Sequence, residues 1–310
     1  MMTESLIHRF IYSLAAFFGV ITIVFFLLHA SGDPLTLLLP MESTPQDVAR
    51  VRHAYGLDLP LSVQYPLFIS RIAHGDLGFS YRYGRPVRQL LQERIVATLT
   101  LALSALAIAT LLGVSLGALA GRNHGSVLDA SAMFVSLIGI SIPSFWLGLV
   151  FIIIFGVLLG WLPISGYGGV RHLVMPSVVL GTAYAAQISR LTRTSLLEVL
   201  GQDYIRTARS KGLAEYAILL KHSLRNASLV VLTLLGLSFG RMLGGAVVVE
   251  SIFAWPGMGR LAVQAVLGRD FPVVQGAVIV GAAVFLGVNF VVDVLCQWLD
   301  PRLRRQSARG

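Results

Sequence analysis

The chain has 310 residues, of which 55% are hydrophobic and only 13% are charged. A soluble domain of ordinary composition is about 45–50% apolar and about 25% charged. This composition excludes a water-soluble monomer, and it excludes intrinsic disorder, which requires low hydrophobicity. The formal net charge is +9, but the basic residues lie between apolar runs, so we expect no nucleic-acid partner. The single cysteine, Cys296, excludes an intrachain disulfide and any site with several cysteine ligands.

Runs without charged residues predict an all-α membrane protein with six transmembrane helices. A helix that crosses the apolar core of a bilayer needs about 20 residues. Five runs fit one crossing each, and Arg241 interrupts the fourth of them: 10–32, 95–121, 172–189, 226–249 and 271–292.

The run 130–170 supplies the remaining crossing, because it is too short for two crossings with a turn between them. Its last third, from Gly160, is rich in glycine, proline and interfacial aromatic residues, which is typical of a loop. The rest fits one long, tilted helix. We expect this helix to bend at Pro143, because proline removes a backbone donor and clashes with the preceding turn.

Lys and Arg residues in the short connections set the expected orientation. With both termini on one side, thirteen such residues lie on that side and three on the other. We therefore expect both termini in the cytoplasm. The first apolar run exceeds the usual length of a signal peptide, about 7–15 residues, and no small-residue cleavage site follows it, so we expect an anchor.

These crossings divide the chain into an N-terminus with the first crossing, a polar insert outside the cytoplasm, a transmembrane core and a cytoplasmic tail: 1–30, 31–93, 94–300 and 301–310. The insert contains six prolines. We expect a structured cap over the first crossing, in preference to a catalytic domain. A helix is predicted to start at Pro45, with Thr44 as its cap.

The connection 190–225 is too long for a simple turn between two crossings. Residues 202–211 suit a short helix that Gly212 ends in the left-handed conformation. A second helix is expected to start near Ala214. Its apolar face would comprise Leu213, Tyr216, Ala217 and Leu220, which follow helical spacing. Such a pair of helices either lies on lipid headgroups or docks into a groove of a partner, and the residues alone favour neither.

Several motifs occur in order along nearly the whole chain. They are Gly32-Asp33-Pro34, Gly56-Leu57-Asp58 with Gln64-Tyr65, Gly75-Asp76-Leu77-Gly78, Pro86-Val87, Ile142-Pro143-Ser144-Phe145, Gly160-Trp161-Leu162-Pro163, residues 203–212, residues 222–227, Glu250-Ser251-Ile252-Phe253-Ala254-Trp255-Pro256-Gly257 and Asp300-Pro301-Arg302. By these motifs the chain resembles the inner-membrane permease subunits of bacterial ATP-binding-cassette (ABC) importers, in their dipeptide, oligopeptide and nickel branch. The resemblance implies the type I importer permease fold. In that fold a periplasmic insert separates the first two helices, and a cytoplasmic coupling helix lies between the fourth and fifth.

The resemblance also makes 202–228 similar to the EAA loop of the family, whose coupling helix sits in a cleft of the ATPase subunit. Ala208 and Gly212 match the alanine and the glycine of that loop. The residues that would contact the ATPase are Asp203, Tyr204, Arg206, Thr207, Ala208, Lys211, Gly212, Leu213, Tyr216 and Leu220. One position departs from the family pattern, because Val230 stands where a proline usually follows the Arg-Asn-Ala stretch.

ATP hydrolysis is expected in partner subunits, so we do not expect this chain to be an enzyme. A phosphate-binding loop needs a Gly-Lys pair, whereas the two lysines, Lys211 and Lys221, follow a serine and a leucine. The resemblance implies that ATP and Mg²⁺ bind to two cytoplasmic ATPase subunits and that this chain holds no cofactor. The other implied partners are a homologous second permease, a periplasmic substrate-binding protein and membrane lipid.

Polar residues at membrane depth are the candidates for a translocation path: Arg241, Glu250, Gln187 and Asn289. An arginine at the centre of a membrane helix costs about 2.5–3.5 kcal/mol on insertion scales, and it usually faces the bundle interior or water. Arg241 would then favour peptide carboxylates. The alternative is a structural ion pair, for instance with Asp293. For Asn289 and Asp293 the ordinary expectation is hydrogen bonding between helices.

The resemblance leaves the cargo open among dipeptides, longer peptides, glutathione and nickel. The seven histidines form no i, i+3 or i+4 pair, so no metal site is predicted. An intramembrane serine protease is disfavoured, because only His29 and His172, both at interfaces, lie in the apolar runs. A secondary transporter would show inverted repeats and broken helices at mid-depth. Six crossings with one long basic cytoplasmic loop fit that class poorly.

Overall fold

A computed structural model describes residues 2–30, 44–54, 58–80, 82–218 and 223–299, which are mostly helical. The long helices are α1 (Met2–Ala30), α5 (Val87–Arg122), α6 (Val127–Ser141), α8 (Val170–Leu200), α11 (Leu224–Ile252) and α13 (Phe271–Leu299). The shorter elements are α3 (Pro45–Ala54), α4 (Leu61–Ala73), β1 (Phe79–Ser80), β2 (Arg85–Pro86), α7 (Ser144–Phe151), the π-helix η1 (Ile152–Leu158), α9 (Asp203–Ser210), α10 (Glu215–Ala217) and α12 (Met258–Leu267).

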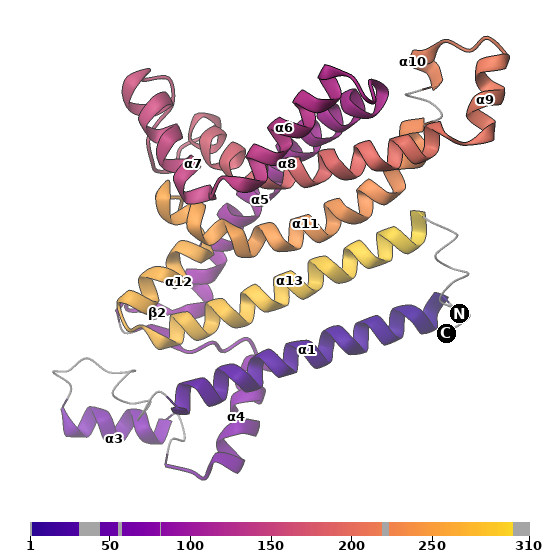
Figure 1. The fold of residues 1–310 in the computed structure, drawn as a ribbon. Coiled ribbons are helices and arrows are strands. Elements are labelled where there is room, and N and C mark those ends of the chain that lie inside the picture. The colour runs from indigo at the N-terminus through magenta and orange to yellow at the C-terminus, as the bar shows by residue number, and fades with distance from the viewer. Residues whose placement is uncertain (1, 31–43, 55–57, 81, 219–222, 300–310) are drawn as a thin grey trace.

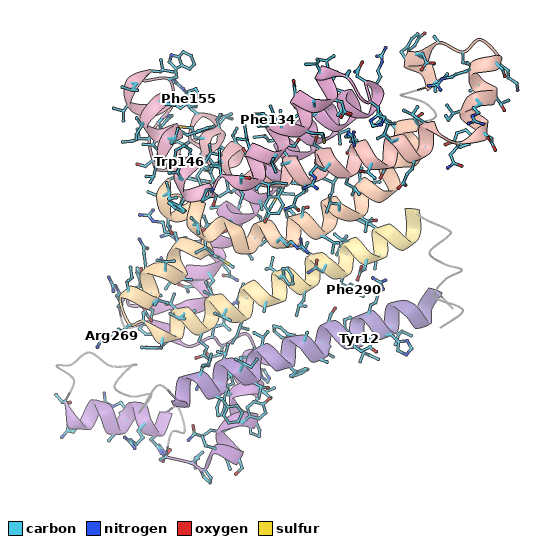
Figure 2. The ribbon with its side chains drawn as sticks, viewed as in Figure 1. Tyr12, Phe134, Trp146, Phe155, Arg269 and Phe290 are labelled. Carbon is cyan, nitrogen blue, oxygen red and sulfur yellow. The ribbon has the colours of Figure 1, made fainter. Side chains whose placement is uncertain are left out.

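Within the described ranges, four helical segments are long and apolar enough to cross a membrane: Ile7–Leu27, Val87–Arg122, Val231–Ile252 and Phe271–Leu295. The bent pair of α6 with α7 and η1 makes five if it counts as one crossing. Large apolar side chains project outward from these helices, among them Tyr12, Phe134 and Trp146 (Figure 2). So many exposed apolar side chains are stable only in contact with lipid, which identifies a helical protein with several membrane crossings.

The predicted bend at Pro143 is present, but it is a break of 100° and not the kink of one tilted helix. The residue before a proline is forced out of the α-helical region. Ile142 accordingly has ψ 121° and Pro143 has ψ 136°, both extended. Two consecutive extended residues end α6 and start α7 in a new direction. The loop predicted from Gly160 is confirmed, since helix resumes only at α8.

Helix α8 covers the predicted crossing 172–189 but continues to Leu200. The segment predicted as the start of a cytoplasmic loop is therefore helical, because Thr192, Ser195 and Leu196 continue the buried face of the crossing. The α8 helix is not among the apolar segments named above. Its buried face carries small polar residues that pack against α5 instead of lipid.

Helices α5 and α8 pack through small residues spaced four apart, which allow close backbone approach within a membrane. On α5 these are Ala105, Ala109, Gly113, Gly117 and Gly121, and on α8 they are Ser177, Gly181, Ala185 and Ser189, all buried. A Cβ at Gly117 would lie 2.4 Å from the Ser189 carbonyl oxygen, and one at Gly181 would lie 2.8 Å from the Ala105 carbonyl oxygen. Each helix therefore places a glycine directly against the backbone of the other helix. The sequence analysis did not detect this pattern.

The start of α1 and the end of α13 lie side by side, at the same end of the bundle as α9 and α10 (Figure 1). Arg9 forms an ion pair with Asp293. The rings of Phe10 and Phe290 make an edge contact with centroids 5.8 Å apart. The two ends of the described chain therefore face the same side, as the charge distribution predicts.

The insert between α1 and α5 lies at the opposite end of the bundle (Figure 1). Helix α3 begins at Pro45, as predicted. The antiparallel pair β1–β2 aligns Phe79 with Pro86. The Ser80 hydroxyl donates to the carboxylate of Asp270, which lies between α12 and α13. This contact fastens the insert to the transmembrane core.

Candidate functional site

The connection between α8 and α11 contains two short helices joined by a tight turn, and we call residues 201–218 the elbow. Gly212, which ends α9, has φ +74°. Its N–H donates to the Arg209 carbonyl at 2.9 Å, and the Leu213 N–H donates to the Ala208 carbonyl at 3.3 Å. These two bonds form a Schellman cap, in which the left-handed residue is usually glycine. The predicted helix, its glycine stop and the second helix after Ala214 are confirmed.

A small hydrophobic core holds the elbow together. Ile205 and Ala208 of α9 are buried against Ile218, and Leu200 at the end of α8 packs on them. Sequence reasoning missed Ile218, because the predicted apolar stripe did not include it. The core explains why a small residue stands at position 208, where the two helices meet.

An ion pair at the surface also ties α9 to α10. The Arg209 Nε donates to Glu215 Oε1 at 2.8 Å. This hydrogen bond, together with the positive charge of Arg209, holds the pKa of the Glu215 carboxyl below its ordinary value. A carboxyl with a depressed pKa stabilises the folded state above its unfolded pKa and loses that contribution as the pH falls. The tie is therefore intact at neutral pH.

The elbow presents apolar side chains outward. Leu213 is 42% exposed, Tyr216 is 67% exposed and Tyr204 is 44% exposed. The expectation that Leu213 and Tyr216 share one face with Ala217 and Leu220 is only partly tested, since Leu220 lies outside the described residues. The elbow's core is closed instead by Ile218, which directly follows α10. Leu213 and Tyr216 are thus not needed by the elbow's own core.

The remaining coupling candidates line the outer face of α9. Asp203 and Arg206 form a long, exposed i, i+3 contact of 3.6 Å. The Thr207 hydroxyl donates back to the Asp203 carbonyl at 3.1 Å. Lys211 is exposed at the turn. These polar groups surround the apolar ones, so the outer face of the elbow is a mixed surface of the kind found at protein interfaces.

A partly buried ion pair lies at the base of the elbow. Arg193 of α8 donates from Nε and Nη2 to the two carboxylate oxygens of Asp129, at 2.6 and 2.7 Å. The Gly125 N–H donates to Asp129 Oδ2 at 3.0 Å, and His124 Nδ1 lies 3.2 Å from the same oxygen. We call these four residues the clamp. It joins the start of α6 to the part of α8 that leads into the elbow. Sequence reasoning counted Arg193 only as a cytoplasmic charge.

Arg241 lies near the middle of the apolar segment Val231–Ile252 and is exposed on the surface of the chain. Among the described residues it forms no ion pair. The alternative partner, Asp293, is bound by Arg9 instead. The hydroxyl of Tyr184 lies 3.5 Å from the point that a Cβ on Gly245 would occupy, and Gly245 lies one helical turn after Arg241 on α11. Arg241 and Tyr184 therefore lie near each other along the α8–α11 seam.

The structure places the two uncharged path candidates on different helix pairs. Gln187 is half-buried on α8. Asn289 of α13 packs over Gly240 of α11, where a Cβ would lie 3.0 Å from the Asn289 Oδ1. Asn289 thus contributes to the α11–α13 contact, which agrees with the ordinary expectation for a polar residue between membrane helices.

Glu250, which was predicted to line the path, takes part in a hydrogen-bond network at the turn between α11 and α12. Its side chain is fully buried. Its carboxylate accepts from the Thr98 hydroxyl at 2.7 Å and from the Arg260 N–H at 2.9 Å, and the Thr98 hydroxyl accepts from the Met258 N–H at 2.8 Å. Glu250 and Thr98 thereby satisfy N–H groups in the first turn of α12, which have no partner within the helix. The carboxylate fixes the turn between α11 and α12.

Trp255, a second residue of the Glu250–Gly257 motif, also has a structural role. Its indole N–H donates to the Ala97 carbonyl at 2.9 Å, and its ring meets Tyr167 edge-on with centroids 4.8 Å apart. Ala254 has φ +50°, a conformation that is uncommon for a residue with a Cβ. The Arg260 guanidinium donates to the Ala254 carbonyl at 2.6 Å and holds it there.

The sequence matches the family of the binding-protein-dependent transport system inner membrane component over residues 113–305, and the N-terminal region of such components over residues 2–102. A putative peptide transport system permease protein of Brucella melitensis is 41% identical over 313 residues, covering 98% of this chain and 99% of that protein. The glutathione transport system permease protein GsiC of Escherichia coli O6:H1 is 40% identical over 304 residues, covering 98% and 99%.

Among solved structures, the inward-facing MetNI methionine ABC transporter aligns with a TM-score of 0.60 and 19% identity, covering 68% of this chain and 97% of the matched chain. At that identity the likeness concerns the fold. The family is one of transport components and not of catalytic enzymes. The long apolar helices, the elbow and these matches lead to one conclusion. This chain belongs to the family of binding-protein-dependent inner-membrane transport components and is a permease subunit of an ABC importer.

Proposed function

We propose that this chain forms half of the path through which an ATP-driven importer carries dipeptides or oligopeptides into a bacterial cell. A periplasmic binding protein delivers the cargo, a homologous permease forms the other half of the path, and two cytoplasmic subunits bind ATP and Mg²⁺. The peptide cargo rests on the Brucella melitensis relative described above, which is named as a putative peptide transport system permease protein. GsiC, named for glutathione, supports a tripeptide as the alternative cargo.

The elbow carries the proposal. Its internal core is closed by Ile205, Ala208 and Ile218, yet Leu213 and Tyr216 remain exposed on its outer face. A rigid element that leaves apolar side chains uncovered is suited to packing into a groove of another protein. We assign that groove to the ATPase. Closure of the two ATPases would then move the elbow and, through the α8 helix and the clamp, tilt the transmembrane helices.

In this proposal the chain crosses the membrane six times, with α8 as the fourth crossing and the α6–α7–η1 segment as the broken third. The elbow and both termini lie in the cytoplasm, and the insert that contains α3 and α4 lies in the periplasm. The start of α1 and the end of α13, which the ion pair of Arg9 with Asp293 joins, lie at the elbow's end of the bundle (Figure 1), and this supports the orientation. Glutathione and nickel remain alternative cargoes of the same architecture.

The path is proposed to run along the seam of α8 and α11, where Arg241, Tyr184 and Gln187 bring polar groups to membrane depth. An exposed guanidinium in the middle of a membrane helix is costly unless it faces water or a partner. A water-filled path shared with the second permease meets that requirement. There the guanidinium would attract the carboxylates that every unmodified peptide and glutathione carry.

Uptake by sealed vesicles that contain the assembled importer tests the proposal. We expect accumulation of a labelled dipeptide to require internal ATP and the binding protein, and to persist when the proton and sodium gradients are collapsed. Uptake that follows those gradients and ignores ATP would instead support a secondary transporter. The extent to which unlabelled glutathione or Ni²⁺ reduces uptake of the labelled dipeptide ranks the candidate cargoes.

A further inference from the structure

A cavity of about 500 Å³ lies where α1, α4, α5 and α13 meet, at the end of the bundle opposite the elbow. Phe17, Leu91, Ile95 and Ile279 make one part of its lining apolar. The polar groups of the lining are Arg88, His74 and Gln92. The sequence analysis and the proposed function assign no role to this cavity.

The polar and apolar parts of the cavity lie at different depths. The charge-free part of α5 begins at Ile95, and Arg88 lies seven residues earlier, which is about 10 Å along the helix axis. Arg88 is therefore at the level of the lipid headgroups, and the apolar lining reaches into the hydrocarbon region. The charged rim and the apolar lining of the cavity therefore follow the same order as the headgroup and the acyl chains of a phospholipid in the membrane.

No described residue neutralises the charge of Arg88. The two nearby carboxylates are bound by other arginines, Asp76 by Arg71 at 3.0 Å and Glu93 by Arg85. Among the described residues, Arg88 makes no hydrogen bond or ion pair. Its guanidinium lies across Gly75, with Nη1 3.4 Å from the point that a Cβ would occupy. The missing side chain at Gly75 lets the guanidinium rest at the rim of the cavity.

We propose that this cavity binds one anionic phospholipid of the surrounding leaflet, with its phosphate at Arg88 and an acyl chain along the apolar lining. Charge complementarity favours an anionic headgroup, because none of the described carboxylates compensates the charge of Arg88 at the rim. A soluble anion would leave the apolar lining uncovered, whereas an acyl chain covers it. The lipid would stabilise the contact of α1 and α4 with α5 and α13.

The headgroup part of the proposal is tested with spin-labelled phosphatidylglycerol and phosphatidylcholine that share the same acyl chains. The assembled importer is placed in nanodiscs, and the motionally restricted fraction of each lipid is measured. We expect a preference for phosphatidylglycerol that Arg88→Gln lowers about fivefold, the effect of removing one arginine near a lipid surface. Arg269→Gln removes an exposed arginine at the same end of the bundle but outside the cavity (Figure 2), and it should leave the preference unchanged.

The acyl-chain part is tested separately. Ala283 lines the cavity and is exposed, so Ala283→Trp fills the space without disturbing the core. We expect it to lower the restricted fraction of phosphatidylglycerol. Val291→Trp, at an exposed site on the same helix outside the cavity lining, is the control. An unchanged preference in Arg88→Gln would overturn the proposal. So would equal losses in Ala283→Trp and its control, or displacement of the labelled lipid by free glycerol phosphate.

Discussion

Arg193 and Asp129 meet through two parallel hydrogen bonds of 2.6 and 2.7 Å, although 64 residues separate them in the chain. The side chain of Asp129 is 7% exposed and that of Arg193 is 24% exposed. A bidentate pair between an arginine and a carboxylate fixes orientation as well as distance. The pair therefore couples the direction of α6 to that of the helix that enters the elbow.

Breaking the clamp is expected to uncouple the importer. Arg193→Gln leaves the buried Asp129 carboxylate without its charged partner, which costs about 1–3 kcal/mol of folding free energy. We expect peptide uptake to fall while ATP hydrolysis by the assembled importer continues. The ratio of transported peptide to hydrolysed ATP measures this effect.

The double variant Arg193→Gln with Asp129→Asn is the control for the clamp. It removes both charges and restores neutral hydrogen bonding, so it should recover part of the stability that Arg193→Gln loses. If the clamp matters only for folding, uptake and hydrolysis will fall together in both variants.

The turn at Gly212 gives a second prediction. A β-branched residue at φ +74° is strained by about 1–3 kcal/mol. Gly212→Val should therefore distort the elbow and lower uptake more than expression or ATP hydrolysis. Gly201→Val is the matched control, since Gly201 has φ −77° and a Cβ there meets only ordinary contacts. Equal uptake by the two variants would remove the elbow from the coupling mechanism.

Because α5 and α8 pack closely through glycines, replacing a glycine at their contact should lower stability, whereas replacing an exposed glycine should not. In Gly117→Ala the new methyl group would lie 2.4 Å from the Ser189 carbonyl oxygen, so the helices must separate. Overpacking of this kind costs about 1–3 kcal/mol, and we expect a lower unfolding temperature in detergent. Gly19→Ala on α1, where nothing lies within 4 Å of the new atom, should unfold like the wild type.

Arg241 is predicted to set cargo preference. Arg241→Gln should lower uptake of a dipeptide with a free C-terminal carboxylate more than uptake of its C-terminal amide. Arg269→Gln, which lies between α12 and α13 and outside the apolar segments, should affect both peptides equally. Unchanged discrimination between the two peptides in Arg241→Gln would exclude this residue from the path.

Glu250 is predicted to act on local structure. Glu250→Ala leaves the Thr98 hydroxyl and the Arg260 N–H without their acceptor, at a cost of about 1–3 kcal/mol for each buried group. We expect faster proteolysis of the turn between α11 and α12, together with a lower unfolding temperature. Cleavage at the wild-type rate would contradict the capping role.

Local chemistry made part of this structure predictable. The glycine stop at position 212, the helix start at Pro45 and a change of direction at Pro143 each depend on residues within one turn of the chain, although the size of the 100° break was not predicted. The apolar runs predicted most of the long helices, because a bilayer demands an uninterrupted apolar length.

The features that escaped prediction depend on residues far apart in the sequence. Nothing near Arg193 indicates that Asp129 is its partner, and the burial of Ile218 follows only once α9 and α10 have folded together. The position of Glu250 at the end of a helix does not indicate its hydrogen bonds to Thr98 and α12, which arise from a contact across 152 residues. The length of α8 was underestimated because charge was taken as the end of the helix, whereas burial against α5 continues beyond it.

Site-specific photo-crosslinking shows directly whether the elbow packs against an ATPase subunit. A photoreactive phenylalanine in place of Tyr216, which is 67% exposed on the elbow, is irradiated in native membranes that contain the whole importer. The account predicts one major adduct, with the mass of this chain plus one ATPase subunit, and no such adduct from the same residue placed at Tyr12 on α1. Adducts with lipid alone at position 216 would contradict the account.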